Sequence, residues 1–304
     1  MAPILFTMPG NEEFGVQLRL FLTCTAGDMQ IRHFADNESR PRLFTGVAAR
    51  DVIFVCTLDH PDQKILALCL AAGVARELGA RSVGFVIPYL PYMRQDARFD
   101  EMEGNVAVHF ARLISSCCDW LVTVDPHLQS YPYFSDIFTA ATRVVPAAPE
   151  VAKWIAENVS QPIIFGSDAE SEHWLAEIAA AADCPYAMMS RTDIGDNDVE
   201  ISIPDASFWI GMSPVLIEDT VSTARTMTAA MKRIKDAGLA PPVCIAIHPL
   251  FSLDTYTGLH AGPVDRIVSC NTVCHTTNRI NLCQPIALAI GEMMESTLVT
   301  RMLA

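Results

Sequence analysis

Short apolar blocks alternate with helix-like patterns along the chain, and this alternation constrains the fold more than any other feature of the sequence. The block 51–58 is typical of a buried strand, and residues 63–78 then carry apolar side chains at helical spacing up to Gly79. The block 82–90 predicts the next strand. Because parallel strands are joined by crossovers that are usually helices, the alternation predicts an α/β fold with mainly parallel sheets flanked by helices.

The same order of elements runs along the chain twice, which predicts two similar domains. The run of Pro and Ala at 146–149 is a plausible linker between them. We therefore expect an N-terminal domain at 1–146, a second domain at 147–284 and a final helical segment at 285–304. Strands are expected at 120–125, 162–168, 186–190, 199–203, 214–219, 242–248 and 266–273, and helices at 105–118, 149–159, 170–182 and 223–237.

The charge and the apolar content of the chain exclude several classes of protein. The net charge is −14, and no run of consecutive Lys and Arg reverses it locally, which argues against binding to nucleic acid or to an anionic membrane. Half of the residues are apolar, so a packed core is expected. No apolar run reaches the roughly 18 residues that span a bilayer, and the N-terminus lacks a basic stretch before its apolar residues.

Ten cysteines are scattered through the chain, mostly within apolar runs. This distribution is typical of buried free thiols in a reducing compartment, so we expect a cytoplasmic protein. A zinc site built from Cys270, Cys274, His275 and Cys283 is the alternative, but that spacing matches no standard zinc-binding motif.

Ligands of parallel sheets bind at the carboxyl ends of the strands, so polar residues at those ends are candidate site residues. The segment after the strand at 82–90 brings Arg94, Gln95, Asp96 and Arg98 together. Arginine offers a rigid fork of donors that suits phosphate, although an ordinary charged loop explains this segment equally well.

Two further strand ends carry a carboxylate. Asp125 and His127 are two residues apart, a spacing that suits a divalent metal with phosphate partners if the segment is extended. A histidine with satisfied hydrogen bonds in a turn is the alternative. Small residues precede Asp168, which allows a ligand to approach the backbone, although a helix cap at Asp168 explains the pattern equally well.

The strongest signal is the segment 215–227, in which a buried strand ends in Glu218 and Asp219 and a Ser/Thr-rich loop leads into a helix. Two consecutive carboxylates can accept hydrogen bonds from the vicinal hydroxyls of a ribose. Loop amides at a helix N-terminus can hold a phosphate, helped by the helix dipole. A helix cap at Ser222 or Thr223 does not explain the two carboxylates, so this segment indicates a sugar-phosphate site.

Five segments of the chain resemble motifs of the ribose-phosphate diphosphokinases, and they occur in the same order as in that family. The segment 215–227 is similar to the phosphoribosyl pyrophosphate loop that this family shares with type I phosphoribosyltransferases. The segments 34–38 and 88–96 are similar to the nucleotide-binding motifs of the diphosphokinases, and 124–127 and 248–252 match two further motifs. The resemblance extends from about residue 4 to residue 290.

The resemblance implies two phosphoribosyltransferase-like domains of type I, with the active site between them and shared across subunits of a homodimer or homohexamer. It implies that the segment 285–304 packs back on the first domain. It also implies Mg²⁺, ATP and a phosphosugar such as ribose 5-phosphate, whose anomeric hydroxyl attacks the β-phosphorus and releases AMP.

The roles of individual residues are implied position by position. The residues implied to bind ATP are Phe34, Asp36, Glu38, Arg94, Gln95 and Asp96. Those implied to bind the sugar phosphate are Glu218, Asp219, Ser222, Thr223, Ala224, Arg225 and Thr226. His127 and Asp168 are implied to bind the metal, and His127 and Arg191 to act in catalysis.

The sequence departs from the family pattern on the sugar-phosphate side and in the catalytic segment. Arg191 and Asp193 stand where the family has Lys and Arg, and Ala169-Glu-Ser171 replaces Ala-Gly-Gly. Ser222 replaces an aspartate, and Arg225 replaces a glycine, whose loss we expect to crowd the phosphate cradle. These changes suggest a modified phosphosugar substrate. The alternatives are a catalytically degenerate, nucleotide-binding regulatory paralogue and a phosphoribosyltransferase that consumes the pyrophosphate donor.

Overall fold

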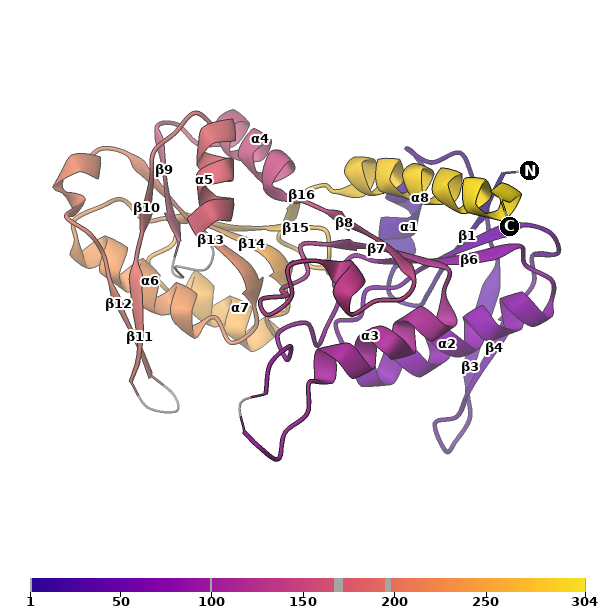
Figure 1. Ribbon diagram of the computed structural model, residues 1–304. Helices are drawn as coiled ribbons and strands as arrows, with labels where there is room; N and C mark the ends of the chain where they lie inside the picture. The colour runs from indigo at the N-terminus through magenta and orange to yellow at the C-terminus, as the bar shows by residue number, and fades with distance from the viewer. Residues whose placement is uncertain (1, 99, 167–171, 195–197, 304) are drawn as a thin grey trace. The chain divides into compact units, whose positions relative to one another are not determined.

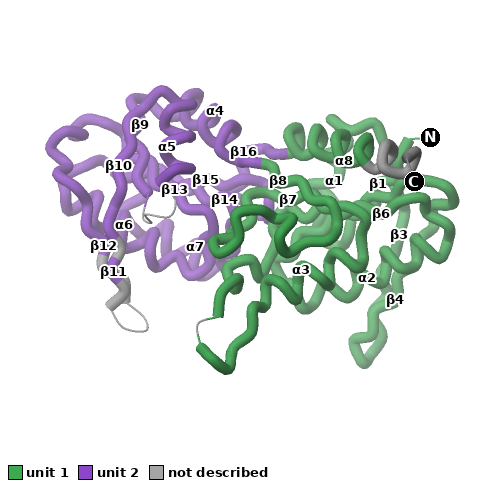
Figure 2. Tube along the Cα trace, in the orientation of Figure 1, with its two compact units in different colours: residues 1–145, 283–304 green, residues 146–282 purple. Residues whose placement is uncertain are grey.

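The computed structural model describes residues 2–98, 100–166, 172–194 and 198–303. The chain divides into two compact units, of which the first contains residues 1–145 and 283–304 and the second contains residues 146–282 (Figure 2). Each unit has its own six-stranded parallel sheet and its own hydrophobic core. The predicted α/β class, with two domains of parallel sheet flanked by helices, is confirmed.

The sheet of unit 1 has the strand order β2-β1-β5-β6-β7-β8, with all neighbours parallel. Its three central strands, β5, β6 and β7, are buried along their whole length. Such strands are mostly apolar because helices cover both faces of the sheet, and they therefore appear in the sequence as nearly continuous apolar blocks. The strands are β1 (Ile4–Thr7), β2 (Thr25–Ala26), β5 (Asp51–Val55), β6 (Ser82–Ile87), β7 (Trp120–Val124) and β8 (Ala141–Val145).

Helices α2 and α3 cover one face of this sheet, and α1 and α8 cover the other (Figure 1). Helix α2 starts with Pro61 in its first position and stops before Gly79, whose φ of +85° suits glycine. The Asn105 side chain caps α3 by accepting a hydrogen bond from the Val108 amide at 3.1 Å. The helices are α1 (Glu12–Leu18), α2 (Pro61–Glu77), α3 (Val106–Cys117) and α8 (Cys283–Leu303), with a short 3₁₀ helix at Phe134–Asp136.

Unit 2 repeats the same topology with the strand order β10-β9-β13-β14-β15-β16, again parallel throughout. Helices α4 and α5 lie on one face of its sheet and α6 and α7 on the other (Figure 1). The strands are β9 (Pro162–Gly166), β10 (Tyr186–Met188), β13 (Ser213–Val221), β14 (Val243–Pro249), β15 (Arg266–Cys270) and β16 (Asn278–Ile280). The helices are α4 (Ala148–Asn158), α5 (Glu172–Ala181), α6 (Arg225–Asp236) and α7 (Leu253–His260), with a 3₁₀ helix at Ala206–Trp209.

Each unit also contains an antiparallel hairpin at the equivalent point of the chain, after its second strand and before its third. The hairpin of unit 1 pairs β3 (Met29–His33) with β4 (Ser39–Leu43), and that of unit 2 pairs β11 (Ser190–Ile194) with β12 (Asp198–Ser202). The sequence predicted only a strand near β12, because a hairpin outside the main sheet has no continuous apolar block. The two hairpins are topological equivalents.

The final helix α8 is the structural equivalent in unit 1 of helix α4 in unit 2. Helix α4 precedes the first strand of unit 2 and packs against α5 and β16, whereas α8 packs against α1, β7 and β8. Arg143 on β8 and Glu292 on α8 form an ion pair at 2.9 Å across this contact. Together with α1, α8 supplies the cover that this face of the sheet requires. Within the described residues, no helix is both long and apolar enough to span a bilayer.

The contact between Gly84 on β6 and Trp120 on β7 provides a test of the core of unit 1. These residues are register partners, and a methyl group added to Gly84 would lie 2.0 Å from a carbon of the buried indole ring. We expect Gly84→Ala to lower the free energy of unfolding by about 1–3 kcal/mol, as overpacking does. Urea denaturation followed by circular dichroism measures this change.

Gly73→Ala on α2 is the matched control, because Gly73 is exposed and nothing lies within 4 Å of an added methyl group. In a helix this change should raise the free energy of unfolding by roughly 0.5–1 kcal/mol. Equal denaturation midpoints for the two variants would contradict the packing described.

Candidate active site

The carboxyl ends of β5, β6 and β7 lie at one edge of the unit 1 sheet, because these three strands are parallel neighbours. The segments that follow them carry Thr57–His60, Arg94–Asp96 and Asp125–Gln129. The strand order reverses between β1 and β5, which is the point where open α/β sheets bind their ligands. The expected site residues of the first domain are therefore brought to one edge, apart from those in the β3–β4 turn.

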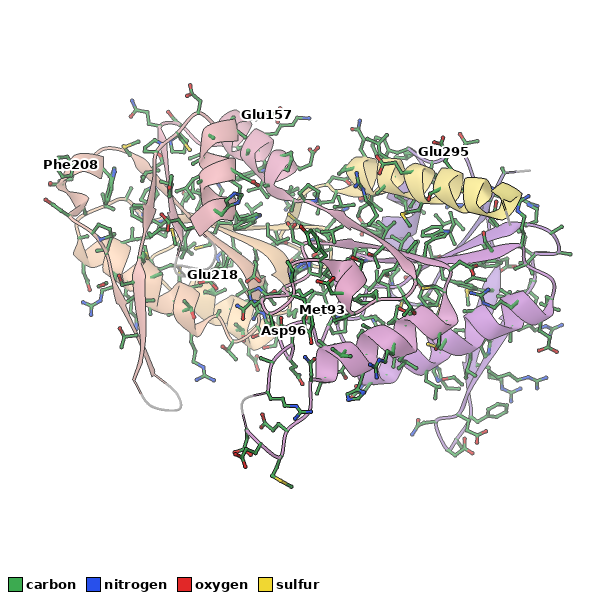
Figure 3. The ribbon with its side chains drawn as sticks, in the orientation of Figure 1. Met93, Asp96, Glu157, Phe208, Glu218 and Glu295 are labelled. Carbon is green, nitrogen blue, oxygen red and sulfur yellow. The ribbon has the colours of Figure 1, made fainter. Side chains whose placement is uncertain are left out.

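Asp96 joins two of these segments from inside the protein. Its side chain is 3% exposed, and its carboxylate accepts hydrogen bonds from the Gln129 and Ser130 amides, both at 2.6 Å, and from the Ser130 hydroxyl at 3.1 Å (Figure 3). Arg94 and Gln95 beside it are exposed. Asp96 therefore holds the segment with Gln129 and Ser130 in place, and the expected contact of Asp96 with ATP stays a prediction.

His127 is half-buried in the loop that Asp96 holds. The Gln129 side-chain amide donates to Nε2 of His127 at 2.9 Å, which places the imidazole proton on Nδ1. Asp125 has a φ of +32°, so the segment turns here and is not extended. We expected Asp125 and His127 to face the same way because we took this segment to be extended. The assumption of an extended segment is wrong.

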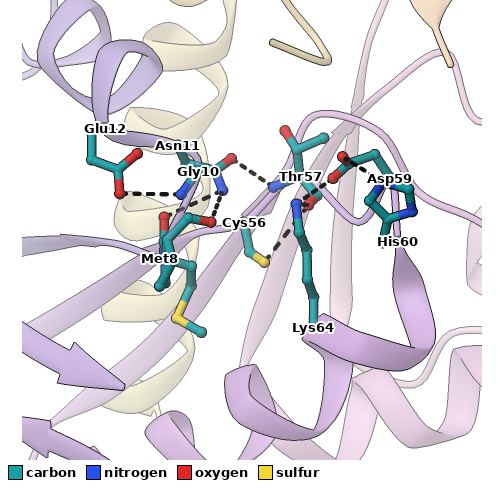
Figure 4. A network of polar contacts seen from close by, with 10 residues as sticks. Met8, Gly10, Asn11, Glu12, Cys56, Thr57, Asp59, His60 and Lys64 are labelled. Carbon is teal, nitrogen blue, oxygen red and sulfur yellow. Dashed lines mark hydrogen bonds and ion pairs between the residues drawn. The ribbon is translucent and has the colours of Figure 1, made fainter. Parts of the chain in front are cut away.

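A polar network joins the loops after β1 and β5 (Figure 4). The buried Asn11 side chain accepts a hydrogen bond from the Thr57 amide at 2.7 Å and donates to the Met8 carbonyl at 3.3 Å. The Lys64 ammonium donates to the Thr57 carbonyl at 3.2 Å and forms a close ion pair with Asp59. Sequence reasoning missed this cluster, although the polar residues Asp59 and His60 directly after a buried strand were a signal.

The turn between β3 and β4 presents the three expected adenosine contacts, Phe34, Asp36 and Glu38, to solvent. Two backbone hydrogen bonds close the turn, from the Phe34 amide to the Glu38 carbonyl and from the Asn37 amide to the Phe34 carbonyl. The Asp36 carboxylate accepts from the Glu38 amide at 3.2 Å. Phe34 is 39% exposed, and the Arg32 guanidinium lies 5.0 Å from its ring centroid. The turn thus displays an aromatic ring beside a planar cation.

In unit 2, Glu218 and Asp219 lie half-buried near the carboxyl end of β13 (Figure 3). Asp219 accepts a hydrogen bond from the Thr220 amide at 2.5 Å. Beyond Val221 the loop exposes Ser222 and Thr223 before α6 begins. The two carboxylates and the two hydroxyls therefore lie along one strand–loop–helix connection.

The start of α6 shows which residue of this loop takes the conformation that favours glycine. The residue with positive φ is Ala224, at +54°, whereas Arg225 is the first helical residue and its side chain is exposed. Arg225 therefore occupies a position that needs no glycine. Ala224 has no side-chain acceptor with which to cap the first amides of α6, and the first turn contains no acidic residue.

His248 is a polar residue of β14 for which no role was predicted. It is 2% exposed, and its register partner on β13 is Thr220 in the candidate sugar-phosphate segment. The Thr272 hydroxyl donates to the Ile247 carbonyl at 2.6 Å, so it accepts from Nδ1–H of His248 at 3.0 Å. An imidazole in an otherwise apolar strand was the available signal. The contact fixes the ring behind the end of β13.

Two expected residues cannot be assigned a geometry. Asp168 lies outside the described residues, and so does the side chain of Arg191, whose backbone belongs to β11. Among the described residues, no group of three or more His, Cys, Asp or Glu side chains is suited to a metal ion. Mg²⁺ usually takes one or two protein carboxylates and completes its shell with substrate phosphates and water, so the expected ion does not require a cluster of three side chains.

Each unit has a parallel sheet of the same topology with an inserted hairpin. In unit 2, a strand that ends in two carboxylates also leads directly into a helix. These features define a protein of the phosphoribosyltransferase class. The model of the N-terminal domain of ribose phosphate pyrophosphokinase matches residues 3–117, and the phosphoribosyl transferase domain model matches residues 136–281. The chain belongs to the ribose-phosphate pyrophosphokinase family. The family resemblance noted in the sequence is thereby confirmed.

Curated relatives of the chain include two archaeal proteins named ribose-phosphate pyrophosphokinase. That of Methanopyrus kandleri is 28% identical over 80% of this chain and 83% of its own length, and that of Saccharolobus solfataricus is 27% identical over 84% and 89%. The crystal structure of phosphoribosylpyrophosphate synthetase from Mycobacterium smegmatis superposes with a TM-score of 0.83 at 18% identity, over 97% of this chain and 100% of that one. The structural likeness confirms the fold.

The hydrogen bonds to Asp96 provide a test of the loop that carries His127. Both backbone amides donate to one oxygen of the carboxylate, and the Ser130 hydroxyl donates to the other. Asparagine would replace the charged acceptor of the two amides by a weaker neutral one and turn its NH2 group toward the Ser130 hydroxyl. We therefore expect Asp96→Asn to lower the free energy of unfolding by about 1–3 kcal/mol. Chemical denaturation measures the effect, and hydrogen exchange should show faster exchange at the Gln129 and Ser130 amides.

Asp100→Asn is the control, since Asp100 lies on the same connection but is exposed and accepts one hydrogen bond, from the Met102 amide. A change within about 0.5 kcal/mol is expected there. If the two variants were equally stable, the anchoring role of Asp96 would be wrong.

Proposed function

We propose that the protein transfers the diphosphoryl group of ATP to the anomeric hydroxyl of ribose 5-phosphate or a related phosphosugar and releases AMP. The observation that carries this proposal is the joint match of both units to the ribose-phosphate pyrophosphokinase family. Each unit also carries residues suited to one of the two substrates. No observation favours a degenerate paralogue or a phosphoribosyltransferase.

On the sugar side, Glu218 and Asp219 would accept hydrogen bonds from the ribose hydroxyls, and residues 222–226 would bind the sugar phosphate. The start of α6 supports this role. The amides at a helix N-terminus can donate hydrogen bonds to a phosphate, helped by the helix dipole, and the exposed Ser222 and Thr223 directly precede this helix.

On the nucleotide side, Arg94 and Gln95 would contact the triphosphate, and Phe34, Asp36 and Glu38 would bind adenosine. The Phe34 ring beside the Arg32 guanidinium supports this proposal, because both groups stack well on planar bases. We further propose that the protein is a homodimer or homohexamer, in which the β3–β4 turn serves the ATP site of a neighbouring copy. All ten cysteines are free thiols, which supports a cytoplasmic location.

In the proposed reaction, the anomeric oxygen forms a bond to the β-phosphorus of ATP, and the bond from that phosphorus to the α,β-bridging oxygen breaks. AMP leaves with this oxygen, and the anomeric proton is lost to a base or to water. Positioning and charge neutralisation supply most of the rate enhancement in phosphoryl transfer. Arg191 would neutralise charge on the transferred group, and His127 and Asp168 would hold the metal–phosphate group.

Mg²⁺ bound to the phosphate oxygens would supply the remaining positive charge. The Asp96 contacts to the Gln129 and Ser130 amides support the role of His127, because they fix its loop. Ser222, Arg225 and the Arg191 segment differ from the family pattern at the sugar-phosphate and catalytic positions. We propose on this basis that the preferred phosphosugar differs from unmodified ribose 5-phosphate.

The first experiment is AMP release from ATP by the purified protein with Mg²⁺ and ribose 5-phosphate, with no-sugar and active-homologue controls. Release that depends on a phosphosugar establishes the activity. A panel of pentose phosphates and their modified forms then identifies the substrate. Ordinary rates with ribose 5-phosphate alone would contradict the altered specificity. Intact ATP binding without release from any phosphosugar would overturn the proposed reaction.

Arg225 allows a sharper test of the sugar-phosphate loop. If its side chain binds the sugar phosphate, Arg225→Ala should raise the KM for the phosphosugar by about tenfold or more, which corresponds to a lost charge-assisted hydrogen bond. The KM for ATP should change little. Steady-state kinetics measure both constants.

Lys232→Ala is the matched control for Arg225→Ala, because Lys232 is an exposed cation on the same helix, away from its N-terminus. It should leave both KM values unchanged. Equal effects of the two substitutions would indicate a general electrostatic effect of α6 and not a phosphate contact by Arg225.

A further inference from the structure

Tyr92 has a backbone conformation that residues with side chains rarely adopt. Its φ is +66°, in the left-handed region, where a bulky aromatic residue is strained. It lies on the connection between β6 and α3, shortly before Arg94 and Gln95, the expected triphosphate contacts. A strained residue persists only where its surroundings hold it, and such residues cluster at functional sites. The contacts of Tyr92 therefore indicate what the strain serves.

Two side-chain contacts hold Tyr92 in this conformation. Its hydroxyl donates a hydrogen bond to a carboxylate oxygen of Asp62, which lies in the first turn of α2. Its ring packs against the ring of Phe110 on α3, with the two centroids 4.7 Å apart. Tyr92 is half-buried and Phe110 is buried. The two helices that cover this face of the sheet therefore both fix the residue.

The Tyr92 hydroxyl remains a hydrogen-bond donor at neutral pH. Its hydrogen bond to Asp62, together with burial and the negative charge of that carboxylate, raises the pKa of Tyr92 to about 12. The phenol therefore keeps its proton. A hydrogen bond to an ionised acceptor is also stronger than one between neutral groups, which suits it to hold a strained turn.

The turn at Tyr92 leads into a segment whose side chains alternate between the interior and solvent. The Gln95 amide donates to the Tyr92 carbonyl at 3.0 Å and closes the turn. Met93 and Asp96 are buried, at 2% and 3% exposure (Figure 3). Arg94 and Gln95 lie between them and are exposed. The turn and the two buried side chains together present this pair to solvent.

The contact between Tyr92 and Asp62 also joins two loops at the carboxyl edge of the unit 1 sheet. Asp62 follows β5, and Tyr92 follows β6, its parallel neighbour. A backbone hydrogen bond from the Leu58 amide to the Tyr89 carbonyl, at 3.4 Å, joins the same two loops closer to the strands. The side-chain contact is the second link, and it lies next to the exposed pair.

We propose that Tyr92 and Asp62 are positioning residues for the nucleotide: their contact holds the strained turn, and the turn orients Arg94 and Gln95 toward the triphosphate of ATP. This inference rests on the proposed function, which takes the exposed pair as the triphosphate contacts. Neither Tyr92 nor Asp62 needs to touch the ligand. Without their contact the turn relaxes, and a displacement of about 1 Å is enough to weaken the interactions of a positioned group.

Binding of ATP to the full-length protein, measured by isothermal titration calorimetry with Mg²⁺ and without a phosphosugar, tests the proposal independently of turnover. Tyr92→Phe removes only the hydroxyl, and Asp62→Ala removes its acceptor. We expect each substitution to raise the Kd for ATP roughly threefold to tenfold, as a lost hydrogen bond to a charged group does. The double variant should be no weaker than either single variant, because both changes remove the same contact.

Asp62→Asn separates positioning from a simple effect of charge. The asparagine oxygen can still accept the hydrogen bond from Tyr92, so this variant should bind ATP nearly as well as the unsubstituted protein. Charge alone would act in the opposite direction, because removal of a carboxylate near a polyanion tightens its binding. Tyr186→Phe on β10 is the control, since Tyr186 is exposed and lies in unit 2, and it should leave the Kd unchanged.

Thermal unfolding of the same variants distinguishes positioning from support of the fold. A purely structural contact would lower the unfolding temperature of Tyr92→Phe and Asp62→Ala without changing the Kd for ATP, and this result would overturn the inference. Tighter binding of ATP by Asp62→Ala would also overturn it. If the unsubstituted protein binds ATP but releases no AMP, the variants still decide the inference although the proposed reaction fails. If it binds no ATP, both are wrong.

Discussion

Parallel pairing of strands that are buried on both faces is the constraint on which the rest of this structure depends. Central strands such as β5, β6 and β14 are buried along their whole length and mostly apolar because helices cover both sides of them. Parallel pairing requires a crossover after each strand, so the loops at the carboxyl ends gather at one edge of each sheet. This geometry brings the segments after β5, β6 and β7 together, although they lie far apart in the chain.

The repeated topology explains the position of α8 and the presence of the two hairpins, which one unit alone does not explain. In unit 2, α4 packs against α5, and in unit 1 the matching contact is that of α8 with α1. Helix α8 thus helps to cover the apolar side chains of this sheet face after the chain has completed unit 2. The two hairpins are also equivalent, so the turn with Phe34 and the segment with Arg191 are the same topological element used for different proposed tasks.

Buried polar contacts hold the candidate site residues in place from behind. Asp96 anchors the His127 loop, Asn11 links the loops after β1 and β5, and Thr272 orients His248 next to β13. Each of these contacts replaces the hydration that a buried polar group loses on folding. A charge or an amide in such a position rigidifies the loop that carries it. The type of a residue near a strand end does not reveal this anchoring, because the partners of Asp96 lie more than thirty residues further along the chain.

The sequence by itself determined the α/β class, the order of the main strands and helices and the family, because apolar periodicity and local motifs are properties of neighbouring residues. It also identified the strand-to-helix connection at 215–227. Only the tertiary structure decided that Ala224 and not Arg225 takes the left-handed conformation, that Asp96 faces inward and that α8 completes unit 1. The physical reason is that burial, hydrogen-bond partners and helix contacts depend on residues distant in the chain, which local patterns do not contain.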